Sequence, residues 1–243
     1  MKLVTVKCTI PAITSLAIGL LLFALIPAGG SAQINKQFYA GVTGGYVMPR
    51  NLHENWNNTA HTQSADLTHE MRNGFLAGIK IGYIPKALKK ILAAELEYNY
   101  QKADVNRITT PGFTAFTVTI PAFSNLANNS GTSFHSIFLN VMARYAEGIV
   151  HPYIGIGPGV TLSTISFNEP DLTAGYGFVE TGEATNVSYQ ILGGVDFDIS
   201  TNISIGGGYK YFATAPAITW ANGTHSHYDP SSHNFVFHVK YYF

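Results

Sequence analysis

The last nine residues of the chain place an apolar side chain at every second position. Successive side chains of a β-strand point to opposite faces, so this segment has one wholly apolar face and one mixed face. A half-buried strand of a soluble protein also alternates, but it rarely ends on five large apolar residues with an aromatic residue last. The pattern therefore predicts a strand that faces lipid. Its apolar face is Phe235, Phe237, Val239, Tyr241 and Phe243, and its other face includes His238 and Lys240.

The same period of two recurs along the chain and predicts eight strands. Beyond residue 32 no apolar run is long enough for a transmembrane helix. A closed barrel is the other fold that pairs every backbone group within lipid. We therefore predict an all-β fold, an eight-stranded antiparallel transmembrane β-barrel with up-and-down meander topology. The predicted strands cover residues 38–48, 75–83, 92–101, 136–145, 153–162, 187–197, 203–211 and 235–243.

The third strand has a competing interpretation, because residues 86–97 have high helix propensity. Against this, Leu92, Ala94 and Leu96 alternate with Glu95 and Glu97. The period of two favours a strand. The first and fifth strands are rich in glycine, which permits the curvature that a small barrel needs.

The connections between predicted strands alternate in length. Short ones fall near residues 84–90, 146–151 and 199–202, and long ones cover about 49–72, 103–132, 164–185 and 213–232. Short periplasmic turns and long extracellular loops are typical of outer-membrane barrels. This pattern predicts that both ends of the barrel lie on the periplasmic side.

Residues 1–32 have the three parts of a cleaved signal peptide: Lys2 and Lys7, an apolar core between Pro11 and Pro27, and small residues up to Ala32. We expect residues 33–243 to be the barrel domain. Cys8, the only cysteine, precedes the apolar core and is therefore not a lipidation site. Loss of the two leader lysines leaves 12 basic and 14 acidic residues. This balance gives no reason to propose nucleic acid or an anionic lipid surface as partner.

Four segments and the chain end resemble the small outer-membrane barrels of the OmpA and OmpX types. The resemblance implies the outer membrane of a Gram-negative bacterium, with outer-membrane lipid and lipopolysaccharide as surroundings. It also implies recognition by the barrel-assembly machinery through Phe237, Val239, Tyr241 and Phe243. The peptidoglycan-binding domain of longer members is not expected here. The segments are 38–42, 152–157, 189–196 and 208–212, and the chain closes on Tyr241-Tyr242-Phe243.

Six charged residues occupy inward positions near the predicted periplasmic end. An eight-stranded barrel leaves room only for side chains, and an isolated buried charge is costly, so we expect these charges to pair. The predicted lumen charge network could also include Lys210, and a gated channel is the alternative to a sealed interior. Its members are Lys80, Glu95, Glu97, Arg144, Asp196 and Lys240.

Three further groups of residues suggest sharper functions, each with a plainer alternative. Serine, histidine and aspartate residues of the fourth long connection could form a hydrolase triad, or simply a solvated loop. The histidines of the first and fourth connections could bind a metal, although their spacing matches no strong zinc pattern. The apolar middle of the second connection could pack as a small hairpin or contact a partner. The residues of the fourth connection are His225, Ser226, His227, Asp229, Ser232 and His233. The histidines of the first connection are His53, His61 and His69, and the apolar residues of the second are Phe113, Phe116, Val118, Ile120, Pro121 and Phe123.

We expect a non-enzymatic barrel with a structural and surface-interaction role, and assign no catalytic, cofactor or metal site. A small channel for ions or hydrophobic solutes is the first alternative. A lipid-modifying enzyme is the second. The residues leave the loop partner and the oligomeric state open.

Overall fold

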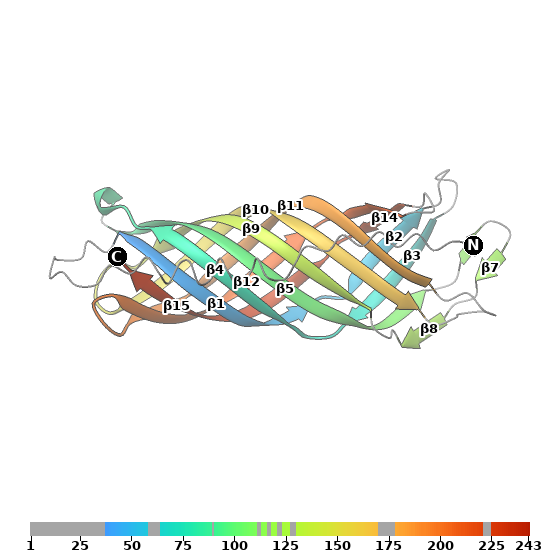
Figure 1. Ribbon diagram of the computed structural model, residues 1–243, viewed down its shortest axis with the longest axis horizontal. Helices are drawn as coiled ribbons and strands as arrows, with labels where there is room; N and C mark the ends of the chain where they lie inside the picture. The colour runs from blue at the N-terminus through green and yellow to red at the C-terminus, as the bar shows by residue number, and fades with distance from the viewer. Residues whose placement is uncertain are drawn as a thin grey trace. The chain divides into compact units, whose positions relative to one another are not determined.

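The computed structural model describes residues 37–57, 64–88, 90–110, 113–115, 118–120, 123–126, 130–169, 178–220 and 225–243. The predicted leader and its cleavage site lie outside these residues. Eight long strands build the barrel, and shorter strands extend it at one end (Figure 1). The barrel strands are β1 (Phe38–Pro49), β4 (Gly74–Tyr83), β5 (Leu92–Thr110), β9 (Gly131–Arg144), β10 (Val150–Glu169), β11 (Phe178–Asp198), β12 (Ile203–Thr214) and β15 (Ser231–Tyr242). The shorter ones are β2 (Leu52–Asn57), β3 (Ser64–Met71), β6 (Phe113–Ala115), β7 (Val118–Ile120), β8 (Phe123–Leu126), β13 (Ala217–Thr219) and β14 (His225–Tyr228).

The eight long strands form a closed antiparallel ring. Each pairs with the next along the chain, and β1 closes the ring against β15 with Tyr39 opposite Tyr242. The predicted eight-stranded up-and-down barrel is thus confirmed. Among the described residues, no helix is long and apolar enough to cross a membrane.

The third barrel strand is β5, as the alternation predicted. Only Lys86–Leu88 are helical, in a single 3-10 turn. Lys90 then adopts a left-handed backbone conformation, and the strand begins at Leu92. Leu96 is exposed on the outer face while Glu95 and Glu97 are buried in the interior, because period-two burial outweighs local helix propensity here.

The outer wall carries the lipid-facing band. On the part of each barrel strand nearest the chain ends, large apolar side chains are exposed that would be buried in a soluble protein. On β1 this stretch runs from Phe38 to Tyr46. With a rise of ~3.3 Å per residue and a tilt of ~40°, this stretch spans about 20 Å of membrane thickness. That is close to the ~25 Å apolar band of outer-membrane barrels.

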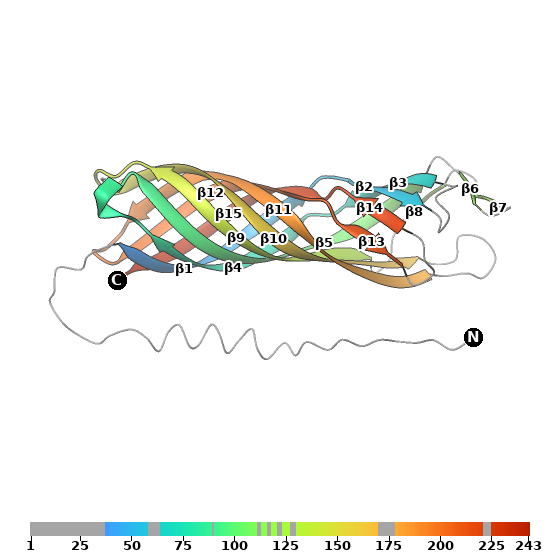
Figure 2. The same ribbon diagram turned by 90° about the horizontal axis from the view of Figure 1, so that it is seen from above.

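The long connections predicted between barrel strands are largely β-structure. This corrects the loops predicted for the first, third and fourth connections. β5, β10 and β11 continue past the lipid-facing band, and β13, β14, β2 and β3 form a sheet joined to the upper part of β5 (Figure 2). The physical reason is a second apolar core, which these segments build above the membrane. It consists of Leu52, Val105, Ile108, Ile165, Ile218, Trp220 and Tyr228.

The middle of the second connection contains a small hairpin, β6 with β7, as one interpretation predicted. β8 pairs with the end of β5. Phe116 and Pro121 lie outside the described residues. Because long connections of outer-membrane barrels are expected on the extracellular side, we call β2, β3, β13, β14 and the upper parts of β5, β10 and β11 the extracellular extension.

Candidate functional site in the barrel interior

The centre of the lumen is built around Glu97, which is fully buried. Its carboxylate accepts a bond from Lys210 Nζ, at the inward face of β12. Asn140 Nδ2 and Gln190 Nε2 donate to the same carboxylate at 3.1 and 2.9 Å. A buried carboxylate needs such partners, because its desolvation otherwise costs several kcal/mol.

A second buried carboxylate, Glu95, lies one inward position closer to the periplasmic end. Its oxygens accept bonds from Tyr39 Oη at 2.8 Å and from Asn140 Nδ2 at 3.0 Å. Lys80 Nζ is 3.7 Å from it. Asn140 therefore links the two carboxylates of β5 through its amide.

Asp196 forms a third group on the opposite side of the lumen. His238 Nε2 and Lys240 Nζ, successive inward residues of β15, lie 2.6 and 2.7 Å from its two oxygens. The ammonium of Lys240 also lies 5.1 Å from the centre of the Tyr39 ring and 5.2 Å from that of Tyr153. An ammonium group is attracted to the face of an aromatic ring, and these two contacts help to hold the Lys240 side chain in place.

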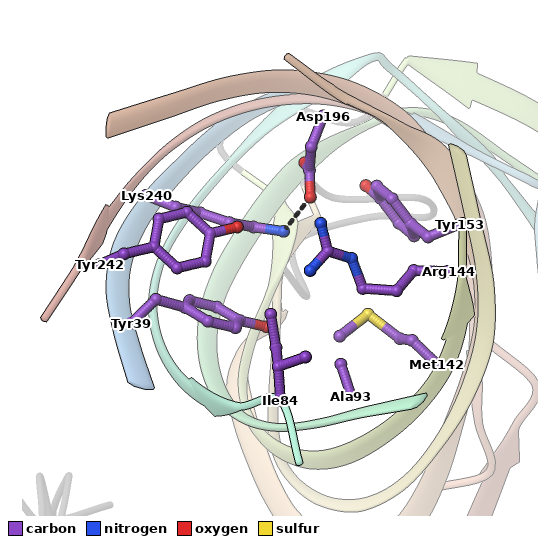
Figure 3. Close-up of a pocket in the computed structure, with 9 residues that line it drawn as sticks. All are labelled: Tyr39, Ile84, Ala93, Met142, Arg144, Tyr153, Asp196, Lys240 and Tyr242. Carbon is purple, nitrogen blue, oxygen red and sulfur yellow. Dashed lines mark hydrogen bonds and ion pairs between the residues drawn. The ribbon is translucent and has the colours of Figure 1, made fainter. Parts of the chain in front are cut away.

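Arg144 is placed apart from these groups. It lines a small cavity at the periplasmic end, where its side chain extends toward the centre between Met142 and Tyr153 (Figure 3). In the described part of the chain it forms no ion pair, unlike the other five members of the predicted charge network. The cavity is also lined by Tyr39, Ile84, Ala93, Met142, Tyr153, Asp196, Lys240 and Tyr242.

Next to the charges, the lumen is filled by polar and aromatic side chains, which alternate along β9 as Phe134, Ser136 and Phe138. Thr161 bonds to Ser136 and Ser188, each at 2.8 Å. Phe212 packs against Phe134 and Phe138, with ring centres 5.6 and 6.1 Å apart. Polar and apolar side chains thus occupy the section of the lumen that a water path would cross.

Two inward glycines make room for these large side chains. A Cβ at Gly82 would lie 2.1 Å from the ring of Tyr39, and one at Gly157 would lie 2.0 Å from Asn140 Oδ1. The glycines of the first and fifth predicted strands were expected to permit curvature, and Gly157 of the fifth permits close approach, as does Gly82 of the second.

The candidate catalytic residues of the fourth connection are dispersed. Ser226 is fully buried in the extracellular extension, where it receives a bond from Trp220 Nε1 at 2.7 Å and donates to Glu54 at 2.6 Å. His69 lies on the far side of Glu54, with Nε2 at 2.9 Å. A nucleophile must contact its base, whereas here a carboxylate separates the serine from the histidine.

The other residues of that group point in different directions. Ser232 lies in the lumen and receives a bond from Gln101, while His233 lies on the outer wall beside Tyr209. Asp229 accepts a bond from the backbone of His53. His227 is exposed on β14.

No set of three or more histidine, cysteine, aspartate or glutamate side chains is grouped for a metal among the residues that the structure describes. His225 and His227 share one face of β14, as an extended segment requires, with His225 bonded to Thr219 at 3.0 Å. His53 contacts Thr68 at 3.3 Å. His61 lies outside the described residues.

The residues predicted as an assembly signal all face outward at the end of β15. Phe237, Val239, Tyr241 and Phe243 are exposed, Phe237 to 75%. The backbone N–H of Phe243 donates to the carbonyl of Phe38 at 3.0 Å, which ties the chain end to the first strand.

The predicted charge network left out the neutral residues that complete it, above all Tyr39, Asn140 and Gln190. Each lies at an inward position of its strand, next to a glycine or a charge across the lumen. The alternation of inward and outward residues along a strand identifies them as inward. Their hydrogen-bond partners, however, depend on how the strands are staggered around the barrel.

A family profile for the outer membrane protein beta-barrel domain matches residues 18–243. Among solved structures, OprG of Pseudomonas aeruginosa is 12% identical, with a TM-score of 0.53 over 88% of this chain and 99% of that one. Neisserial surface protein A is 16% identical, with a TM-score of 0.46 over 88% and 100%. The outer membrane protease OmpT of Escherichia coli is 8% identical, with a TM-score of 0.42 over 88% and 99%. No curated protein sequence is significantly similar to the chain.

Proposed function

Because this chain belongs to the outer membrane protein beta-barrel domain family, we propose that it is a non-enzymatic structural barrel that displays a rigid surface for interaction outside the cell. It resides in the Gram-negative outer membrane. Fold and family do not assign a role by themselves, because one barrel architecture carries many functions. The proposal therefore rests on the interior and on the extracellular extension.

The observation that carries the proposal is a continuous filled interior. Paired charges, the polar group around Thr161, the rings around Phe212 and the apolar core around Trp220 all consist of buried side chains. Close-packed interiors hold few voids larger than a water molecule. A conducting path would have to displace several of these side chains together.

The extension supports a surface role because its backbone groups are paired and its apolar residues are packed. By the same rise and tilt as above, the stretch from Lys102 to Thr110 adds roughly 20 Å beyond the lipid-facing band. A packed scaffold of this kind positions its connecting segments for binding.

The enzymatic alternative finds little support in the same region. Ser226 is fully buried and hydrogen-bonded to Trp220 and Glu54, so no substrate reaches it without opening the core. Mass analysis of lipid A from cells with and without the protein tests this alternative. Unchanged lipid A is expected, and a protein-dependent change in acylation would establish an enzyme.

The experiment that tests the proposal is single-channel recording of residues 33–243 refolded into a planar bilayer. We expect a silent membrane from a preparation whose folding is verified by heat-modifiable migration on gels. Stable, reproducible conductance steps from the folded barrel would instead establish the channel alternative. The buried charges would then be the first residues to substitute.

A further inference from the structure

Two matching side-chain clusters lie on the outer wall at the upper edge of the lipid-facing band. In each, a Tyr-x-Tyr segment of one strand pairs with a Ser-x-His segment of the next. The first cluster consists of Tyr98, Tyr100 and Lys102 on β5 with Ser133 and His135 on β9. The second consists of Tyr209 and Tyr211 on β12, Ser231 and His233 on β15, and Arg50 after β1.

The histidine is held in the same way in both clusters. Tyr98 Oη lies 2.8 Å from His135 Nδ1, and Tyr209 Oη lies 2.6 Å from His233 Nδ1. Within the described residues, each of these two histidines forms its hydrogen bond through Nδ1, and Nε2 forms none. A hydroxyl that donates to Nδ1 selects the tautomer with its proton on Nε2, which leaves that N–H as a donor.

A second tyrosine packs beside each histidine. The His135 ring centre is 4.9 Å from that of Tyr100, and the His233 ring centre is 5.5 Å from that of Tyr211. Each imidazole is thus bonded by one tyrosine and packed against another, which fixes its orientation on an otherwise open wall.

Each cluster also contains a basic residue and a serine at the same level. Lys102 lies opposite Ser133 where β5 pairs with β9. Ser133 is two residues from His135 and therefore lies on the same face of the strand. Arg50 donates its backbone N–H to the carbonyl of Ser231 at 2.9 Å, and Ser231 is likewise two residues from His233. Diagonal neighbours of this kind lie roughly 7–8 Å apart, a separation that one anionic group can bridge with long side chains.

The level of the clusters is set by what lies below and above them. Toward the periplasm, the outward residues after His135 are Ile137 and Leu139, and those after His233 are Phe235 and Phe237. Beyond the histidines the outward positions become polar. The clusters therefore lie where acyl chains end and headgroups begin.

The two clusters lie on opposite sides of the barrel. Two strands, β10 and β11, separate them in one direction around the ring, and β1 and β4 separate them in the other. The histidine rings of both clusters lie on the outer wall, while Arg50 and Ser231 of the second also border an interior pocket beside Phe212.

We propose that each cluster binds a phosphate of an acylated phosphoglycolipid of the outer leaflet. Lys102 or Arg50 supplies the positive charge, the histidine Nε2–H and the serine hydroxyl donate hydrogen bonds, and the acyl chains lie on the apolar wall below. Charge-assisted hydrogen bonds of this kind are the strong ones at a phosphate. The proposal rests on the outer-membrane location and is independent of whether the lumen conducts.

The test is native mass spectrometry of the refolded barrel, residues 33–243, titrated in detergent with three probes. These are bisphosphorylated lipid A, its dephosphorylated form and phosphatidylglycerol. We expect two lipid A molecules to be retained, and neither of the other two lipids to be retained comparably.

Variants then assign the sites. Lys102→Met with His135→Phe is expected to remove one of the two lipid A molecules and weaken binding there by about tenfold or more. Arg50→Met with His233→Phe is expected to do the same at the other site. Tyr46→Phe is the matched control, because Tyr46 lies at the same level opposite Phe235 and has no histidine partner among the described residues.

Heat-modifiable migration verifies that each variant is folded, and His135→Gln replaces His135→Phe if the latter fails this check. Retention of two lipid A molecules by the folded double variants would overturn the proposal. Equal retention of dephosphorylated lipid A, or phosphatidylglycerol binding with the same dependence on these residues, would also overturn it.

Discussion

The substitution Glu97→Gln removes the carboxylate at the centre of the lumen while its shape stays nearly the same. The amides of Asn140 and Gln190 keep an oxygen to which they can donate, but buried Lys210 loses the carboxylate that pairs with it. Breaking a buried ion pair by removing one partner costs about 3–5 kcal/mol. Because Glu95 remains nearby to compensate part of the charge, we expect a value near the lower end, about 3 kcal/mol.

The assay is urea unfolding in lipid vesicles, followed by the fluorescence of Trp56 and Trp220, the two tryptophans of the chain. Since both tryptophans lie in the extracellular extension, loss of heat-modifiable migration serves as the second probe. Adding Lys210→Met to Glu97→Gln is expected to recover at least about 2 kcal/mol, because the unpaired charge is then gone.

The matched control is Glu70→Gln. Glu70 lies 3.8 Å from Arg107, and the two side chains are 45% and 43% exposed. An exposed pair of this kind is worth about 0–1 kcal/mol. If Glu97→Gln costs no more than Glu70→Gln, or if Lys210→Met deepens the loss, the paired-charge account of the lumen is wrong.

Four further predictions follow from the packing. Phe212→Ala should lower the free energy of unfolding by about 3–5 kcal/mol by urea titration, and a change below ~1 kcal/mol would show that the aromatic group is loose. Arg144→Ala should change it by less than ~1 kcal/mol, because no ion pair is lost; a larger loss would reveal a partner. Gly157→Val should prevent refolding as judged by gel migration, since its Cβ meets Asn140, and normal refolding would contradict the close approach. Trp220→Phe should increase hydrogen exchange in β14 through loss of its bond to Ser226, and unchanged protection would exclude that role.

The barrel strands could be predicted from the sequence because lipid exposes one face of every strand. An outward apolar residue such as Leu96 then lies between the inward polar residues Glu95 and Glu97, and this signal survives in β5 although helix propensity opposes it. The strands of the extracellular extension follow a weaker signal. β14 pairs with β2, far away in the sequence, and Ile218 and Trp220 alternate over too few positions to identify a strand alone.

The inward charges could be named from strand parity, but their partners could not. Asp196 pairs with two residues of β15, whereas Arg144 at the mouth pairs with none in the described structure. Which side chains meet across a lumen depends on register and tilt, and these are set by the whole ring. The net charge of the chain likewise does not predict the proposed phosphate sites on the outer wall, because these depend on where Lys102 and Arg50 lie.

Thiol labelling of the lumen tests the filled interior most directly. Residues 33–243 contain no cysteine, so Ser188→Cys introduces one thiol into the polar group around Thr161, where Ser188 is 1% exposed. In the folded barrel this thiol is expected to resist a water-soluble maleimide, while the control His227→Cys, exposed on β14, reacts within minutes. Labelling of Ser188→Cys at the rate of the control, without unfolding, would show that water passes through the lumen and would contradict the closed barrel.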